Sequence, residues 1–171
     1  MRSFRYLVGA CVLQMMVIFF PLAYDAYLRS FGEEVWLEMR LYDPRDMLRG
    51  HYLRISSAQS ALKLMPSWCE YGKMPKKAYL VLKKDVQGQA MFTELSDEKP
   101  EGLFLTVIPE HRYCQGDDTW PIELPFQRYY MNENRAQDIE RERSLQEETL
   151  FHLQLFIKDG AYSLGALEPK P

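Results

Sequence analysis

Residues 6–24 read YLVGACVLQMMVIFFPLAY and carry no charged side chain, with Arg5 before them and Asp25 after them. A helix of this length extends about 28 Å, close to the hydrocarbon thickness of a bilayer. A cleaved signal peptide shows a similar pattern but needs small residues three positions and one position before the cut, and residues 21–26 offer no such pair in register. The stretch therefore predicts an uncleaved transmembrane anchor.

The charges around this stretch give little information on its orientation. Two arginines precede it and three more lie between residues 25 and 45, so the positive-inside rule is nearly neutral. The segment before the stretch, residues 1–5, is short, however, and an anchor at the start of a chain usually carries the following domain across the membrane. We therefore expect the N-terminus inside and the domain outside. In a bacterium this means a cytoplasmic tail (1–5), an anchor in the lipid bilayer of the inner membrane (6–24), a juxtamembrane linker (25–34) and a periplasmic domain (35–171).

The composition of the whole chain suits one modest domain with a hydrophobic core. Of its 171 residues, 47% are hydrophobic and 26% are charged, and the formal net charge is −3. These values argue against disorder, collagen-like repeats and a multidomain enzyme. The mixed, slightly acidic charge offers no basic face for a nucleic-acid backbone, so we expect no nucleic-acid partner.

Beyond the anchor, residues 35–42 alternate between apolar and polar side chains, the period-two pattern of a half-buried strand. The apolar members share one face: Val35, Leu37, Met39 and Leu41. A second strand is predicted from His51, with Leu53 and Ile55 on the same face as this histidine. We expect it to pair antiparallel with the first strand across a loop of about eight residues.

Further strands follow along the chain. Residues 102–110 alternate in the same way, whereas Pro121 and Pro125 restrict residues 121–131 to an edge or an extended segment. Six or seven strands are expected in all. Two hairpins are predicted from pairs of strand-like segments around turns: residues 78–84 and 89–95 around residues 85–88, and residues 150–158 and 161–167 around Asp159-Gly160.

Residues 133–148 break this pattern, because they are rich in Glu, Arg and Gln and contain neither proline nor glycine. Arg143 is spaced for favourable pairs with Glu140 and Glu147 on a helix. A short surface helix is predicted here; a partner-binding helix is the alternative, although solvated charged helices are commoner. The sequence therefore predicts a mainly β (α+β) fold: an N-terminal transmembrane helix followed by a small antiparallel β-rich domain with one surface helix.

Two cysteines, Cys69 and Cys114, lie in the exported part of the chain, where an oxidising compartment permits a disulfide. Closing their loop would stabilise the fold by about 4 kcal/mol in the chain-entropy model. A metal site supplemented by His111 is the alternative, but one cysteine and one histidine at that spacing are a weak zinc signal. We favour the disulfide and expect neither a metal nor another cofactor.

Residues 42–55 read YDPRDMLRGHYLRI and resemble the signature of the bacterial GDYXXLXY family, whose members typically carry a DPRD-like run before the named motif. Residues 127–130 and 138–140 are similar to the family's later RYY and acidic-helix region. The chain departs from the motif at His51, Ile55 and Ser57, where the family usually has Asp, Leu and Tyr. The resemblance covers most of the chain after the anchor. It implies a small membrane-anchored bacterial protein of undefined function and supplies no catalytic residues.

The charged turn in this motif has two interpretations. Its acids and bases can pair among themselves, each exposed pair contributing about 0 to 1 kcal/mol, or Arg45 and Arg49 can form an anion or peptide site with the turn amides. We favour the first, and we interpret His51 as a hydrogen-bonded strand residue rather than a pH-responsive group or a base. The candidate motif and binding residues are Asp43, Pro44, Arg45, Asp46, Arg49, Gly50, His51, Tyr52, Arg128, Tyr129 and Tyr130.

An N-terminal anchor before an exported β-rich domain also resembles signal peptidases, which use a serine activated by a lysine. Met47 and Leu48 stand where that serine would be, and no other coherent constellation emerges. We therefore predict no catalytic residues and no enzyme, but a single-pass inner-membrane protein that acts as an accessory or interaction subunit, with another membrane protein as its partner. A degenerate signal-peptidase-like or other hydrolytic domain is the alternative.

Overall fold

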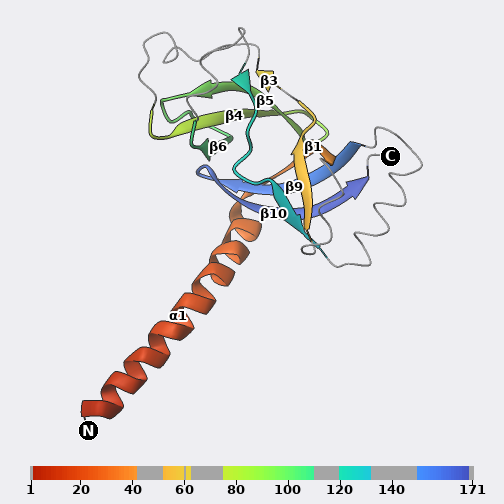
Figure 1. Cartoon of the computed structure of the whole chain (residues 1–171). Coiled ribbons are helices and arrows are strands. Elements are labelled where there is room, and N and C mark those ends of the chain that lie inside the picture. The colour runs from red at the N-terminus through yellow and green to blue at the C-terminus, as the bar shows by residue number, and fades with distance from the viewer. Residues whose placement is uncertain are drawn as a thin grey trace.

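The computed structural model describes residues 2–41, 52–59, 61–62, 75–109, 120–131 and 150–169. Figure 1 shows a long helix that projects from a domain of curled β-sheet. The elements are α1 (Arg2–Phe31), β1 (Glu33–Leu41), β2 (Tyr52–Ser57), β3 (Ala61–Leu62), β4 (Ala78–Lys84), β5 (Gln89–Ser96), β6 (Phe104–Val107), β7 (Trp120–Pro121), β8 (Arg128–Tyr130), β9 (Leu150–Lys158) and β10 (Ala161–Pro169). The predicted fold class, one apolar helix followed by a β-rich domain, is confirmed.

Helix α1 is longer than the predicted anchor, because it continues through residues 25–31, which the sequence suggested as a linker. No glycine or proline interrupts these residues, and Arg29 pairs with Asp25 one turn earlier (2.7 Å). The helix ends before Gly32, whose amide donates to the Leu28 carbonyl (2.7 Å). A Cβ at this glycine would collide with that same carbonyl oxygen. The helix therefore leads into β1 without an intervening linker.

The large sheet is mixed rather than purely antiparallel. Its main order is β10-β9-β1-β5-β4-β6, and β2 and β8 branch from β1. The predicted antiparallel pairing of the first two strands, β1 with β2, is confirmed, and so are the hairpins β4–β5 and β9–β10. The parallel pair is β1 with β5. It joins strands that are distant in sequence, and so the local patterns did not indicate it.

The sheet forks along one edge of β1. Trp36 and Leu37 pair with β5, whereas Met39 and the two residues after it pair with β2, and β9 occupies the other edge of the strand. Gln59 lies at the fork. Its side-chain amide donates to the Phe92 carbonyl of β5 (2.8 Å), and its side-chain oxygen accepts from the Phe92 amide (3.0 Å). The glutamine side chain thus takes the place of a backbone partner where the sheet divides.

The sheet curls until its two ends meet. The amide of Thr106 in β6 donates to the carbonyl of Gly160 (3.0 Å), in the turn between β9 and β10. Asp159 and Gly160 both have positive φ (51° and 79°), as the predicted two-residue hairpin requires. A side chain at Gly160 would overlap Thr106 and Phe104. Glycine is therefore required at position 160 both for the conformation of the turn and for the close contact with β6.

The hydrophobic core fills the inside of this curl. The predicted alternation is confirmed in β1, where residues 35, 37 and 39 are fully buried, and β9 follows the same rule at residues 151–157. Two predictions were inexact. The strand expected at 102–110 is only β6, and the described residues contain ten strands rather than six or seven, because the two-residue strands β3 and β7 have no periodicity to detect.

Candidate functional site

The structure describes only part of the predicted site. Residues 43–51 of the motif lie outside the described residues, and so do Cys69, Cys114 and the helix expected at 133–148. Tyr52 begins β2, and Arg128, Tyr129 and Tyr130 form β8. The predicted ion-pair turn, the disulfide and the surface helix therefore stay predictions.

The structure joins the two parts of the motif that are distant in sequence. Strand β2, which carries the second half of the motif, pairs antiparallel with β8. In this register Tyr52 lies opposite Tyr130, Leu53 opposite Tyr129, and Arg54 opposite Arg128. Leu53 is buried in the core, whereas both arginines are exposed. The β2–β8 pair therefore presents two opposed arginines on its outer face.

The register also sets how close these arginines are. The Ile55 amide donates to the carbonyl of Gln127, its partner when the register is extended by one residue (3.0 Å). Residues 55 and 127 are therefore a hydrogen-bonded pair, and Arg54 and Arg128 form the adjacent non-hydrogen-bonded pair. In such pairs the Cα atoms approach to about 4.5 Å and the side chains are closest. The two arginine side chains therefore leave the backbone at the shortest spacing that an antiparallel ladder provides.

These arginines line a groove of about 360 Å³ between β2 and the irregular segment 122–127. Its apolar wall includes Leu124 and Phe126, both buried, and its polar groups come from arginine, serine, glutamine and one glutamate. Its volume lies at the lower end of the range for small-molecule sites. The full lining is Arg54, Ile55, Ser56, Ser57, Ile122, Glu123, Leu124, Phe126, Gln127 and Arg128.

The charges of the groove favour an anion. Arg54 and Arg128 supply two positive charges and Glu123 one negative charge. Each of these three residues also interacts with other groups of the protein. Guanidinium groups present planar pairs of donors that fit carboxylate and phosphate oxygens. The arrangement can therefore hold an oxyanion beside an apolar wall.

Strand β10 fixes the position of the segment that forms this groove. The Tyr162 hydroxyl donates to the Pro125 carbonyl (3.1 Å), and its ring lies 4.9 Å from that of Phe126. Burial raises the pKa of the Tyr162 phenol, because the phenolate would lose hydration. The Tyr129 hydroxyl donates to the Gly165 carbonyl (2.8 Å). Three contacts thus fasten residues 125–129 to one stretch of β10.

The end of α1 is fastened to the same stretch. Ser163 donates to Asp25 (2.5 Å), and Arg29 donates to the Leu164 carbonyl (2.6 Å) as well as to Asp25. Neighbouring residues of a strand point to opposite faces, so Ser163 meets the helix on one face of β10 while Tyr162 meets the groove segment on the other. We call residues 25, 29, 163 and 164 the helix lock.

The sequence identified some of this site and missed the rest. Arg128 was predicted as a binding residue, but Arg54 and Glu123 were not. The alternation in the motif places Arg54 away from the core, yet only the pairing of β2 with β8 shows what it faces. Within the described ranges, no three His, Cys, Asp or Glu side chains gather where they could hold a metal ion.

Comparison with known proteins identifies the chain at the level of its family. The family profile described as GDYXXLXY protein matches residues 14–164. That range includes most of α1 and every described strand except the last residues of β10. Comparison with curated proteins and with solved structures gives no match. The extent of the family match, from helix α1 through the closing hairpin, shows that this chain belongs to the GDYXXLXY family.

Proposed function

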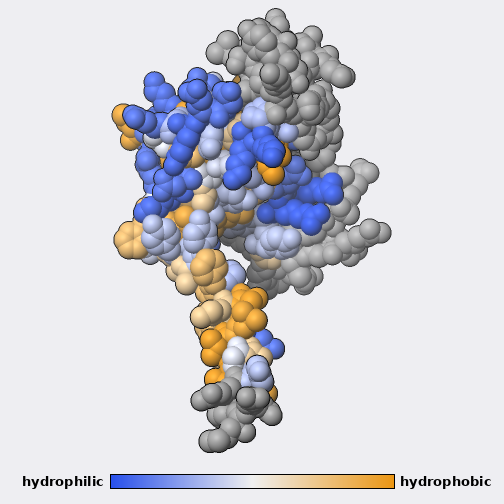
Figure 2. Space-filling model, turned by 90° about the vertical axis from the view of Figure 1, so that its left-hand side faces the viewer, coloured by the Kyte–Doolittle hydropathy of each residue, from blue (hydrophilic) through white to orange (hydrophobic). Residues whose placement is uncertain are grey.

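We propose that this chain is a single-pass bacterial inner-membrane protein whose β domain lies in the periplasm and acts as an accessory or interaction subunit for another membrane protein. The observation that carries the proposal is helix α1. Residues 6–31 are long and apolar enough to cross a membrane, and none of the most apolar 18-residue window of this helix is buried in the protein. In Figure 2 the exposed surface of this helix is mostly apolar, whereas polar surface dominates the described part of the domain.

The helix carries aromatic side chains where it approaches the domain. Phe20 stacks on Tyr24, Tyr24 on Tyr27, and Tyr27 contacts Phe31, with ring centroids 5.2 to 6.4 Å apart. Lys158 of β9 lies over Tyr27 (4.8 Å) and Phe31 (5.3 Å). Tyrosine and lysine gather where membrane helices pass from hydrocarbon to headgroups. This aromatic ladder supports a membrane–water boundary close to residues 24–31.

The helix lock supports a retained anchor over a cleaved signal sequence. Leu28 is buried against the domain, and Asp25 and Arg29 bind β10. Cleavage near residue 26 would separate Asp25 from Ser163 and leave Leu28 and Arg29 on a short new N-terminal end. A segment that belongs to the packing of the mature domain is expected to stay attached to it.

The orientation is tested with a site-specific protease. A recognition sequence is inserted in the exposed β4–β5 turn at residues 85–88, and the protease is added to intact spheroplasts. We expect cleavage of this protein without lysis, because the turn would face the periplasm. The matched control carries the same sequence in the tail at residues 1–5 and should be cleaved only after lysis. The reverse pattern, or an intact mass that lacks residues 1–24, would contradict the proposal.

The accessory role is tested by photo-crosslinking in living cells. Tyr130 is an exposed aromatic residue on β8, and tyrosine is enriched in protein interfaces. A photo-reactive residue at this position is expected to capture one membrane protein in stoichiometric amount. The same residue at Val86, which is fully exposed in the distant β4–β5 turn, should not capture it. Recovery of the chain alone from position 130 would remove the main support for an accessory role.

A further inference from the structure

We propose that the groove between β2 and residues 122–127 binds the headgroup of an anionic phospholipid, with Arg54 and Arg128 holding the phosphate. The inference deepens the proposed function and rests on its membrane anchor. It identifies a ligand of definite chemistry: a phosphate oxyanion attached to an apolar body. Three features carry it, namely the two arginines, the apolar wall and the position of the groove relative to the helix.

The opposed arginines supply the site for the phosphate. Arg54 and Arg128 occupy a non-hydrogen-bonded pair of positions, and their guanidinium groups can bind two edges of one phosphate. The nearby Ser56 hydroxyl can add a further donor. An anion that binds the folded domain and not the unfolded chain is expected to stabilise the folded domain.

The apolar wall explains why the ligand would be more than a free phosphate. Leu124 and Phe126 line the groove next to the charged groups, and both are buried. A simple inorganic anion would leave the small apolar part of the groove surface exposed to water. The glycerol and the first carbons of an acyl chain would cover it, while the phosphate stays at the arginines.

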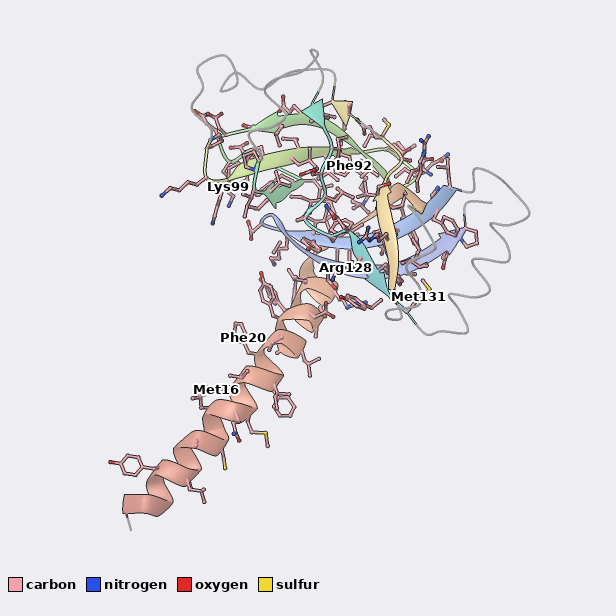
Figure 3. All side chains as sticks on the ribbon, viewed as in Figure 1. Met16, Phe20, Phe92, Lys99, Arg128 and Met131 are labelled. Carbon is pink, nitrogen blue, oxygen red and sulfur yellow. The ribbon has the colours of Figure 1, made fainter. Side chains whose placement is uncertain are left out.

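The position of the groove places it close to the expected lipid surface. The helix lock contacts Ser163 and Leu164 of β10, and the groove segment contacts the flanking residues Tyr162 and Gly165, so one short stretch of this strand connects the two. Figure 3 shows Arg128 on the side of the domain nearest the helix, whereas Phe92 lies farther from it. With residues 24–31 at the membrane boundary, the groove lies within reach of headgroups.

The experiment measures thermal unfolding of the full chain in nanodiscs. The discs contain either phosphatidylcholine alone or phosphatidylcholine with 30% phosphatidylglycerol. We expect the anionic lipid to raise the melting temperature of the wild type. The groove variant Arg54→Gln with Arg128→Gln should lose this shift. The control variant Lys83→Gln with Lys99→Gln removes the same charge from exposed positions outside the groove and should keep it.

A second measurement guards against a variant that fails to fold. The affinity of the detergent-solubilised protein for short-chain phosphatidylglycerol is measured by native mass spectrometry on the single variants Arg54→Lys and Arg128→Lys. We expect about a tenfold loss for each, since lysine keeps the charge but cannot form the paired hydrogen bonds. An unchanged affinity in both would overturn the proposal.

The remaining outcomes separate the possible sources of the anion. Equal melting shifts in the groove and control variants would show a non-specific surface effect and overturn the proposal. A full shift from inorganic phosphate in phosphatidylcholine discs would assign the groove to a soluble anion and overturn the lipid. A protein that inserts into discs but shows no headgroup dependence would refute this inference alone, whereas failure to insert would refute the membrane anchor itself.

Discussion

At the residue scale, the side chain of Gln59 does what a strand backbone does elsewhere in the sheet. It binds both backbone polar groups of Phe92, the amide and the carbonyl, at the fork where the edge of β1 passes from β5 to β2. The backbone amide of Gln59 donates to the Ser57 hydroxyl oxygen (3.1 Å). Ser57 occupies the last position of the family motif, so the motif strand ends at the fork.

We predict that Gln59→Leu lowers the free energy of unfolding by about 1–3 kcal/mol, because it leaves the part-buried amide and carbonyl of Phe92 without their partner. Urea unfolding of the detergent-solubilised protein measures this change. Gln87→Leu, at an exposed glutamine in the β4–β5 turn, is the control and should alter stability by less than about 0.5 kcal/mol. Equal effects of the two substitutions would mean that the fork does not depend on Gln59.

Tyr162 predicts a dependence of stability on alkaline pH. Burial raises the pKa of its phenol above that of the unfolded chain, which titrates near pH 10. Above about pH 10 the unfolded state therefore releases a proton that the folded state retains, and stability falls as the pH rises toward the folded pKa. Tyr162→Phe should flatten this decline, whereas Tyr130→Phe, at an exposed tyrosine, should not. Urea unfolding between pH 9 and pH 12 measures how the free energy of unfolding depends on pH. The same dependence in all three proteins would show that Tyr162 does not cause the decline.

At the element scale, the β9–β10 hairpin is both a turn and the contact that closes the sheet. We predict that Gly160→Ala lowers the free energy of unfolding by about 2–4 kcal/mol, because the methyl group meets Thr106 and Phe104 in addition to the cost of positive φ. Gly102→Ala is the matched control. That glycine also has positive φ (102°) but has open space around its Cβ position, so only about 1–2 kcal/mol is expected. If thermal or urea unfolding gives the same loss of stability for Gly160→Ala and Gly102→Ala, the contact between Gly160 and β6 does not contribute to stability.

The elements also show how far the sequence alone reaches. Alternation predicted β1 and β2 because one face of each strand is buried, and the turn residues Asp159 and Gly160 predicted the last hairpin because they adopt positive φ. The fork, the parallel β1–β5 pair and the meeting of Arg54 with Arg128 depend on pairing between distant segments. No local pattern determines such a register, so the candidate groove emerged only from the folded structure.

At the scale of the whole molecule, the helix lock joins α1 to the domain without an intervening linker. Its bonds connect Asp25 and Arg29 to β10, and Gly32 allows the chain to turn directly into β1. The direction of the helix relative to the domain is therefore expected to be fixed. A fixed direction would hold the groove at a constant height above the membrane.

We predict that the double substitution Asp25→Ala and Arg29→Ala broadens the distribution of distances between the helix and the domain. Spin labels at Met16 and Val86, introduced through an unnatural amino acid, report this distribution by pulsed electron paramagnetic resonance. The wild type should give one narrow distribution. Lys99→Ala, which removes an exposed ion pair with Asp159 that does not involve the helix, should leave it narrow. A distribution that stays equally narrow in the double variant would mean that packing alone fixes the helix.

The place of β1 in the sheet has a consequence for the order of biosynthesis. β1 is made directly after the anchor, yet along one whole edge it pairs with β9, which is synthesised more than a hundred residues later. Contacts so distant in sequence form late and slowly. The domain therefore cannot complete its sheet until β9 has left the ribosome, because β1 lacks its partner along one edge until then. If the domain is exported as proposed, a chain that stays unfolded during this interval would be suited to passing through a translocation channel, and its folding would be completed on the far side.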